Sequence, residues 1–283
     1  MATTPQQSNE VTRVALKRNA PGSNELNDIP VKSPYFENLS QSLPDPNATE
    51  IPLDQSQADK MPSPRLVSRL GPAFFQQPCI HLAKQLLGQV LVRMVGDQRL
   101  SGRIVETEAY VGAEDTACHT YKGKQTASNK SMFLDPGHAY VYMTYGMYHC
   151  INITSQGEGQ AVLLRALSPL EGKDTMTNLR QKASKRSDRE FKTKDLCNGP
   201  GKLCLSLDID RQLDGTNLTE RDSCLWIESG DQILDGDIVS CPRIGIDSAT
   251  KEWVEKPLRF YVIGNPCVSK RNKAREEEIK NAK

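Results

Sequence analysis

The chain has 283 residues, with 36 lysines and arginines against 35 aspartates and glutamates, a formal net charge of +1. A balance so close to neutral does not by itself indicate a nucleic-acid partner. The sequence shows no signal peptide and no long apolar span, so no membrane role is expected. The eight cysteines form no C-x-x-C pair and lack histidines at zinc spacing. This pattern predicts free thiols in a reducing intracellular compartment and no structural zinc site.

Residues 1–62 differ from the rest of the chain. They are rich in proline, serine, asparagine and glutamine, and they carry 5 basic against 8 acidic residues. Because they show no apolar periodicity, they cannot bury enough surface to offset the entropy of ordering. We therefore predict a disordered tail over residues 1–62, one globular domain over 63–270, and a charged tail with an exposed helix over 271–283.

The apolar pattern predicts these elements in chain order. Strand alternation is found at residues 89–95, 101–111, 139–143, 147–154, 161–167, 223–228, 238–246 and 258–263, and helical spacing at 79–87, 170–180 and 201–207. Residues 112–130 are expected to form a loop. The strands gather without regular alternation with helices, which predicts an α+β fold: a single domain with a curved, mainly antiparallel sheet and surrounding helices.

The strand at 101–111 carries two carboxylates and a tyrosine. Glu106, Glu108 and Tyr110 have the same parity, so their side chains should project from one face. Two carboxylates beside a ring can divide acid–base work, because burial raises one pKa while the other group stays ionised. A strand with two solvent-facing acids shows the same pattern. His119 follows in the predicted loop, and it can join a site only if that loop folds back over the strand.

A hairpin rich in tyrosine is the sharper signal. Gly146 favours a tight turn, which places Tyr142 in the strand and Tyr145 at the exposed tip. An aromatic side chain at such a tip can unstack a base step and fill the gap left by a flipped base. A packed tyrosine is the common alternative in hairpins.

Two polar residues stand in apolar strands, and both invite an explanation. Asn152 lies between two isoleucines, and Arg165 lies in a run of leucine and alanine. Such side chains are usually paired or directed at a site, although exposed strand faces also carry them. Residues 180–202 hold eight basic and three acidic residues. This stretch is either a solvated face or a patch that follows phosphates.

Taken together, these features resemble the alkyladenine DNA glycosylase family, the mammalian type of 3-methyladenine DNA glycosylase. The resemblance covers roughly residues 65–270. Its motifs lie at residues 103–110, 132–133, 140–148, 152–157, 162–167, 169–172, 198–204, 243–245 and 256–262. The segments after His119 and after residue 245 depart from the family pattern, which concerns loop contacts rather than the pocket.

The resemblance implies a role for each matched residue. Glu108 would be the general base that activates water, with Arg165 positioning that water. The flipped base would lie between Tyr110 on one side and His119 with Tyr142 on the other. The remaining implied roles are exclusion of guanine by Asn152, insertion into the duplex by Tyr145, and contacts to the DNA backbone by Lys202 and Met132.

The implied activity is that of a monofunctional DNA glycosylase in base-excision repair. It would flip out 3-methyladenine, 7-methylguanine, hypoxanthine or ethenoadenine and hydrolyse the N-glycosidic bond, leaving an abasic site. The implied partner is double-stranded DNA with alkylated or deaminated purines, bound by a monomer that uses no metal and no other cofactor. We expect a nuclear location, with mitochondria as a second compartment, and contacts of residues 1–62 with repair proteins.

Two other classes of function compete with this interpretation. A non-catalytic nucleic-acid-binding module would need Tyr145 and the basic stretch but not Glu108. A sugar-directed glycoside hydrolase would use Glu106 and Glu108 as its acid pair, since alternate strand residues lie about 6–7 Å apart. The exposed tyrosine and the presence of only two tryptophans argue against a sugar-binding platform.

Overall fold

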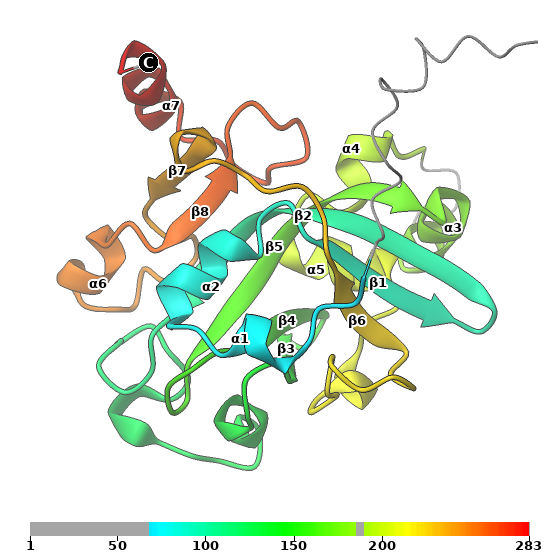
Figure 1. The fold of residues 1–283 in the computed structure, drawn as a ribbon, viewed down its shortest axis with the longest axis horizontal. Helices are drawn as coiled ribbons and strands as arrows, with labels where there is room; N and C mark the ends of the chain where they lie inside the picture. Colours follow the sequence, from blue (N-terminus) through cyan, green and yellow to red (C-terminus); the bar gives the residue numbers. More distant parts are fainter. Residues whose placement is uncertain (1–67, 185–189, 283) are drawn as a thin grey trace, which may run out of the picture. The chain divides into compact units, whose positions relative to one another are not determined.

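The computed structural model describes residues 68–184 and 190–282. The tail predicted for residues 1–62 lies outside this part of the chain, as do five residues of the basic stretch. The described residues form an α+β domain, which confirms the predicted fold class (Figure 1).

One eight-stranded sheet organises the described part of the chain. Its strands are β1 (Val90–Val95), β2 (Gln98–Tyr110), β3 (Ala139–Thr144), β4 (Tyr148–Thr154), β5 (Ala161–Glu171), β6 (Leu225–Glu228), β7 (Ile238–Cys241) and β8 (Arg259–Val262). The strand order is β3-β4-β5-β2-β1-β6, and β8 pairs with both β2 and β7. Every one of these strand pairs is antiparallel, as predicted.

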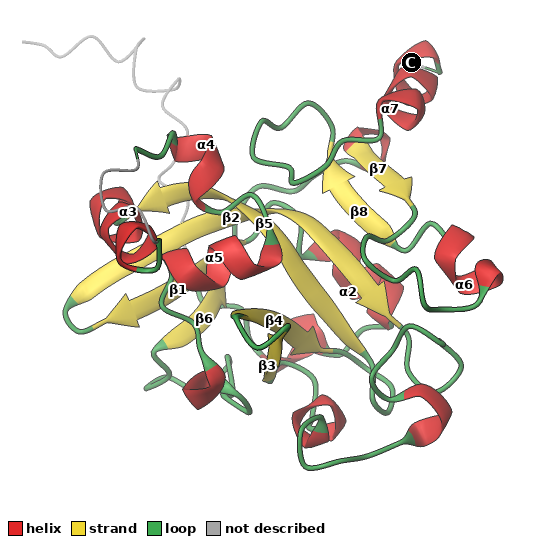
Figure 2. Ribbon diagram, turned by 180° about the vertical axis from the view of Figure 1, so that it is seen from behind, coloured by secondary structure: helices red, strands yellow, loops and turns green. Residues whose placement is uncertain are grey.

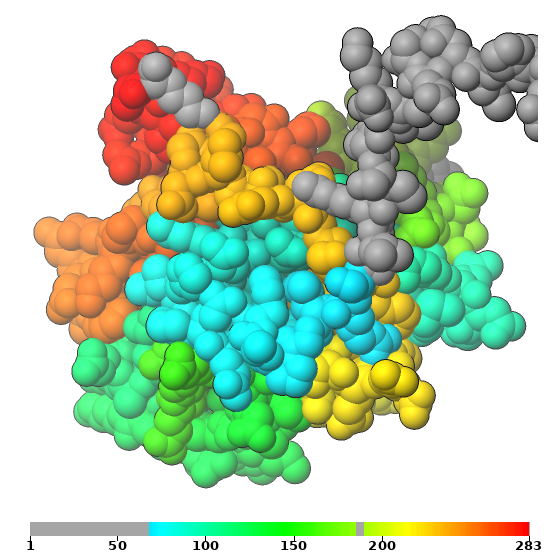
Figure 3. Space-filling view, viewed as in Figure 1, coloured from blue at the N-terminus to red at the C-terminus, as the bar shows by residue number. Residues whose placement is uncertain are grey.

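Helices lie on both faces of the sheet. They are α1 (Pro72–Phe75), α2 (Cys79–Gln85), α3 (Lys173–Lys182), α4 (Thr193–Leu196), α5 (Pro200–Ser206), α6 (Lys251–Glu255) and α7 (Lys273–Asn281). α2 lies in front of the sheet in Figure 1, whereas α5 lies in front in the reverse view of Figure 2. In the space-filling view, α1 and α2 (cyan) cover the middle of their face (Figure 3). Leucines of α2 and α5 pack on the buried side chains of β2 and β5, and each fully buried leucine contributes about 1.5–3 kcal/mol.

The long strand β2 changes partner along one edge. Its residues 98–103 pair with β1, and its residues 106–108 pair with β8, while β5 follows the other edge. At this changeover the pairing of β2 with β5 shifts register on both strands, which leaves Val105 and Arg165 as the extra residues. A bulge of this kind redirects the side chain that it carries. It is the feature that brings Arg165 toward the carboxylates of β2.

Several predicted boundaries were wrong for local reasons. β5 runs to Glu171 instead of ending at residue 167, and α3 begins only after Gly172, whose φ is +72° and whose position leaves no room beside Leu100 for a Cβ. β7 ends at Cys241 instead of continuing to residue 246, because Pro242 has no N–H for a sheet ladder. The short helices α1, α4 and α6 were not predicted. The exposed C-terminal helix was predicted correctly, and Glu276 attaches it to β8 by accepting a 3.0 Å hydrogen bond from the Tyr261 hydroxyl.

Candidate active site

The two carboxylates of β2 are both fully buried but differ in their partners. Glu106 accepts four hydrogen bonds: from Arg165 Nε at 3.1 Å, Arg259 Nη1 at 2.9 Å, Ser269 Oγ at 2.9 Å and the Ser269 N–H at 2.6 Å. Two of the four donors are buried arginines and one is a backbone N–H, so Glu106 is an anchored carboxylate, with three of the bonds on Oε1 and one on Oε2. This side chain holds β2, β5, β8 and the segment after β8 together, and it cannot serve as the free acid that a paired-carboxylate sugar hydrolase needs.

Glu108 keeps one oxygen less engaged. Its Oε1 accepts the Ile244 N–H at 2.8 Å and lies 3.2 Å from Arg165 Nη1. Its Oε2 accepts only the Tyr110 hydroxyl, at 3.0 Å. Burial, and then the negative charge of Glu108, raise the pKa of Tyr110 well above its usual value. The phenol therefore stays neutral and donates to the carboxylate, which leaves Oε2 able to accept a further proton donor.

An aromatic cavity of about 170 Å³ lies next to this carboxylate. Its lining residues are Tyr110, Ala117, Cys118, His119, Met132, Tyr140, Tyr142, Thr144, Asn152, Gly245 and Ile246. Glu108 does not line the cavity itself but is joined to it through the Tyr110 hydroxyl. Asn152 is 4% exposed, and its Nδ2 donates to the Tyr140 carbonyl at 3.1 Å, which fixes the amide in the wall.

The loop after β2 does fold back over the sheet, as a role for His119 requires. The His119 ring makes an edge contact with Tyr142 at 4.6 Å between centroids, and its Nδ1 lies 2.8 Å from the Tyr140 hydroxyl. Asn129 donates to the His119 carbonyl at 2.9 Å and fixes the loop backbone. Loss of water around the imidazole lowers the pKa of His119 below its usual value, although the residue as a whole is exposed. At neutral pH the ring is therefore uncharged.

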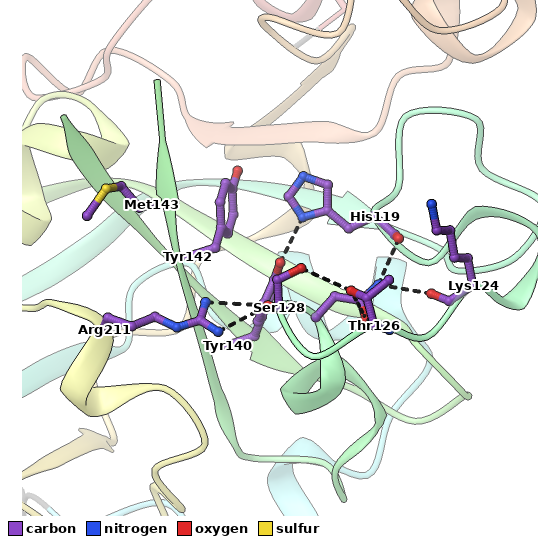
Figure 4. Close-up of a pocket in the computed structure, with 9 residues that line it drawn as sticks. His119, Lys124, Thr126, Ser128, Tyr140, Tyr142, Met143 and Arg211 are labelled. Carbon is purple, nitrogen blue, oxygen red and sulfur yellow. Dashed lines mark hydrogen bonds between the residues drawn. The ribbon is translucent and has the colours of Figure 1, made fainter. Parts of the chain in front are cut away.

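A second cavity of about 510 Å³ shares three aromatic side chains with the first, those of His119, Tyr140 and Tyr142. Figure 4 shows these side chains together with the basic residues Lys124 and Arg211 that also line it. Arg211 Nη1 donates to the Val141 carbonyl at 2.9 Å, so its guanidinium is held beside β3. This second cavity combines aromatic rings with positive charge.

The β3–β4 hairpin ends in an exposed apolar tip. Tyr145 is 82% exposed and has a φ of +52°, and Gly146 has a φ of +65°. The Met147 N–H closes the turn on the Thr144 carbonyl at 3.1 Å. Two consecutive positive φ angles are those of a type I′ hairpin turn, in which an aromatic residue is unusual. Met143 and Met147 are also more than half exposed, so the tip is an apolar surface without a folding role.

The tip stands between two basic hollows. Met143 lines the 510 Å³ cavity with Lys124 and Arg211, whereas Met147 lines a 770 Å³ groove that also includes Lys202. Lys202 is exposed on α5, and its Nζ donates to Asn198 Oδ1 at 2.7 Å. Cationic side chains thus flank the exposed aromatic on either side.

The structure brings together most of the predicted site residues. Five of them line the 170 Å³ cavity, namely Tyr110, His119, Met132, Tyr142 and Asn152. Two lie beneath it, Glu108 and Arg165, and two lie outside it, Tyr145 at the tip and Lys202 on the groove. Met132 is only 3% exposed, and its N–H already donates to the Asn129 carbonyl. It is therefore a wall residue here, and its contact with a DNA backbone stays a prediction.

Three residues that shape the site were missed by sequence reasoning. Tyr140 stacks on Tyr142 at 5.3 Å between ring centroids. The shared parity of these two tyrosines in β3 could have indicated it. Asp115 and Arg243 form a buried ion pair behind Tyr110. Each is a single charged residue in a loop, and nothing in the sequence marks them as partners.

Residues 68–184 and 190–282 contain neither a metal-binding cluster nor a membrane-spanning helix. No three histidine, cysteine, aspartate or glutamate side chains come together there as ligands for a metal ion. None of the helices in this part of the chain has the length and apolar character needed to cross a membrane.

Proteins that take a base out of the duplex hold it in a snug pocket between aromatic or apolar side chains, and the 170 Å³ cavity has walls of this kind. The sequence profile of the methylpurine-DNA glycosylase family matches residues 73–266, and the chain belongs to this family. It is 52% identical over 205 residues to the DNA-3-methyladenine glycosylase of Mus musculus, covering 71% of this chain and 61% of the mouse protein.

Further relatives give the same result. The DNA-3-methyladenine glycosylase of Homo sapiens is 48% identical over 215 residues, which cover 75% of this chain and 72% of the human protein. A putative 3-methyladenine DNA glycosylase of Methanocella arvoryzae is 45% identical over 200 residues, which cover 70% of this chain and 94% of that protein. The chain thus spans less than two thirds of the mouse relative but nearly all of the archaeal one.

Proposed function

We propose that this protein is a monofunctional DNA glycosylase that extrudes a damaged purine from duplex DNA and hydrolyses its N-glycosidic bond. The observation that carries the proposal is the contact between Glu108 and Tyr110, which joins a buried carboxylate with spare acceptor capacity to an aromatic cavity. Membership of the methylpurine-DNA glycosylase family supports it, as does the similarity to the DNA-3-methyladenine glycosylases of mouse and human.

The aromatic side chains suit a flat and electron-poor ligand. Alkylation at N3 or N7 makes a purine cationic, and cations bind well to the faces of tyrosine rings. The base would lie against Tyr110 on one side and His119 with Tyr142 on the other. The imidazole is uncharged at neutral pH because its pKa is lowered, so it does not repel such a ligand. Asn152, fixed in the wall, would crowd the exocyclic amino group of normal guanine.

Hydrolysis needs a proton-accepting group, a general base, next to the sugar. Water would donate its proton to Glu108, its oxygen would form a bond to C1′ of the deoxyribose, and the C1′–N bond would break with its electron pair leaving on the purine. The products are an abasic site and the free base, which is neutral when the lesion is a cationic alkylated purine. An uncharged lesion such as hypoxanthine leaves as an anion that takes up a proton from solvent, and Glu108 returns its proton to solvent. The carboxylate also stabilises the positive charge that develops on the sugar. Arg165, held between Glu106 and Glu108, would position the water.

The proposed chemistry stops at the abasic site. Strand cleavage by a bifunctional glycosylase would need an amine that attacks C1′ and forms a Schiff base. Among the described residues, the side chains that line the 170 Å³ cavity include no lysine, which supports a monofunctional reaction.

The hairpin tip supplies the second half of the proposed function. Tyr145 would insert into the duplex and occupy the space that the extruded nucleotide leaves. Lys124 and Arg211 on one side of the tip and Lys202 on the other would bind backbone phosphates. We include 3-methyladenine, 7-methylguanine, hypoxanthine and ethenoadenine among the expected lesions. A monomeric state, a nuclear location and contacts of residues 1–62 with repair proteins also remain predictions.

A duplex with a single hypoxanthine tests the proposal. The full chain is incubated with the labelled duplex, and one half of the sample is heated in alkali to cleave abasic sites. We expect intact strands without alkali and cleavage at the hypoxanthine with alkali, and no cleavage of a control duplex with adenine there. A parallel duplex with 7-methylguanine tests a cationic lesion. Failure on both lesions would contradict the proposal, whereas cleavage without alkali would contradict only its monofunctional part.

A further inference from the structure

A buried ion pair lies behind the base pocket without lining it. Arg243 Nη1 lies 2.6 Å from Asp115 Oδ2, and Arg243 Nη2 lies 2.8 Å from Asp115 Oδ1, with both side chains fully buried. Removing two charges from water costs several kcal/mol, and well-packed apolar side chains often stabilise a fold as well as such a pair. The geometry of this pair therefore calls for a reason beyond stability.

The arginine contacts the base pocket at two points. Its guanidinium carbon lies 4.6 Å from the centroid of the Tyr110 ring, and its Nη1 donates to the Ala109 carbonyl at 3.0 Å. Tyr110 lines the cavity whereas Arg243 does not, so the guanidinium supports the ring from outside the cavity. The next residue, Ile244, donates its N–H to Glu108 at 2.8 Å. One side chain thus fixes both the ring and the segment that orients the carboxylate.

The aspartate fixes the opposite part of the pocket. Asp115 Oδ1 also accepts the Ala117 N–H at 3.0 Å, and Oδ2 accepts the Val111 N–H at 3.4 Å. These bonds define the path of the chain from the end of β2 to Cys118 and His119, which line the cavity. The ion pair is therefore the direct connection between the Tyr110 side and the His119 side of the pocket.

We propose that Asp115 and Arg243 are positioning residues, which set the spacing between Tyr110 and His119 and hold the Ile244 N–H on Glu108. The inference rests on the proposed function. Neither side chain lines the cavity, and both are fully buried, so we expect neither to contact a ligand there. Their loss should therefore slow base release while leaving the affinity for DNA without a base largely unchanged.

Arg243→Lys is the first variant, because it keeps the charge but loses the planar fork that bonds both carboxylate oxygens. Single-turnover release of hypoxanthine is measured beside the Kd for a duplex with a tetrahydrofuran abasic analogue. We expect release to fall roughly 10- to 100-fold, since misplacement by about 1 Å has effects of this size. The Kd for the abasic analogue should stay within about two-fold of the parental value, because that ligand has no base to stack.

Arg99→Lys is the matched control. Arg99 also bonds carboxylates on two sides, those of Glu171 and Glu228, but contributes nothing to the pocket. The Arg99→Lys variant should release hypoxanthine at the parental rate. The double variant Asp115→Asn with Arg243→Lys should lose no more than the more affected single variant, because the two residues act as one unit.

The outcomes separate this inference from the function on which it rests. If the parent releases no base, the proposed function fails, and the ion pair is not the cause. If the parent is active and folded Arg243→Lys releases hypoxanthine at the parental rate, the inference is wrong. It is also wrong if release and affinity for the abasic analogue fall together. Should Arg243→Lys not fold, Asp115→Glu, which keeps the charge, takes its place with the same expected results.

Discussion

The buried carboxylates of Glu106 and Glu108 form the floor of the base pocket, and Tyr145 forms the tip of the β3–β4 hairpin. These two regions differ in burial and in how firmly their side chains are held. Glu108 is fully buried and held by bonds from three residues, whereas Tyr145 is 82% exposed in a left-handed conformation. Hydrolysis needs a carboxylate whose position is fixed before the substrate arrives. Insertion into a duplex needs an apolar side chain that no part of the fold already covers. We therefore assign chemistry to the floor and extrusion of the base to the tip.

Glu108→Gln should have the largest effect, because an amide of the same shape cannot accept the proton from water. General base catalysis contributes about 10²- to 10⁴-fold, so we expect a loss of that size in the single-turnover rate. Affinity for the abasic analogue should stay near the parental value. Glu171→Gln, at the far end of β5, serves as the control. A rate for Glu108→Gln near that of the parent would remove this residue from the mechanism.

Glu106→Gln tests whether Glu106 has a structural role in the floor of the pocket, in contrast to the catalytic role proposed for Glu108. This change disturbs a carboxylate that bonds Arg165 and Arg259, both of which are buried. Disrupting a buried ion pair costs about 3–5 kcal/mol, so the free energy of unfolding should fall by that amount in urea titrations. Glu278→Gln on α7, where the ion pair with Arg275 is exposed, should change it by less than about 1 kcal/mol. Unchanged stability of Glu106→Gln would contradict the structural role of this carboxylate.

Tyr145→Ser should weaken extrusion without altering the chemistry. Unstacking and unpairing cost a few kcal/mol, which an inserted ring partly offsets. We expect release to fall about ten-fold for a stably paired lesion, and by less when the lesion is in a mismatch or bulge. Leu234→Ser removes an apolar side chain that is 67% exposed and lines none of the cavities described above, and this variant should behave like the parent. A loss that is the same for paired and bulged lesions would contradict the insertion of Tyr145.

The pH dependence should show the smallest effect. Desolvation lowers the pKa of His119 below the ordinary value of about 6.5. The ring therefore stays neutral at pH 7 and becomes charged only as the pH falls through its lowered pKa. Release of cationic 7-methylguanine should decline over that range. Folding stability should decline as the pH falls from the ordinary pKa of about 6.5 to the lowered pKa and then level off, because only the unfolded state binds the proton in that window. His119→Gln should lack this decline in the release rate at acid pH. If the release rate of His119→Gln declines at acid pH as that of the parent does, another group titrates.

The sequence predicted those parts of the fold and site that depend on local patterns. Alternation of β-branched residues predicted β1 and β4, and Gly146 after Tyr145 predicted the exposed tip. Glu106 and Glu108 could not be told apart in the same way, because both have the same parity in one strand. Their difference comes from a bulge that delivers Arg165 and from partners on β8 and beyond it. Asp115 and Arg243 are in contact although they are 128 positions apart in the sequence, and no local pattern indicates such a contact.

A duplex with one ethenoadenine measures extrusion and hydrolysis in a single sample, because its fluorescence reports the extrahelical base and its release reports bond cleavage. It tests most directly the division of labour between the pocket floor and the hairpin tip. We expect Glu108→Gln to give the full change in fluorescence on binding with almost no release. Tyr145→Ser should give a smaller change, with release reduced in proportion. Loss of the fluorescence change in Glu108→Gln, or a full change in Tyr145→Ser, would contradict the account.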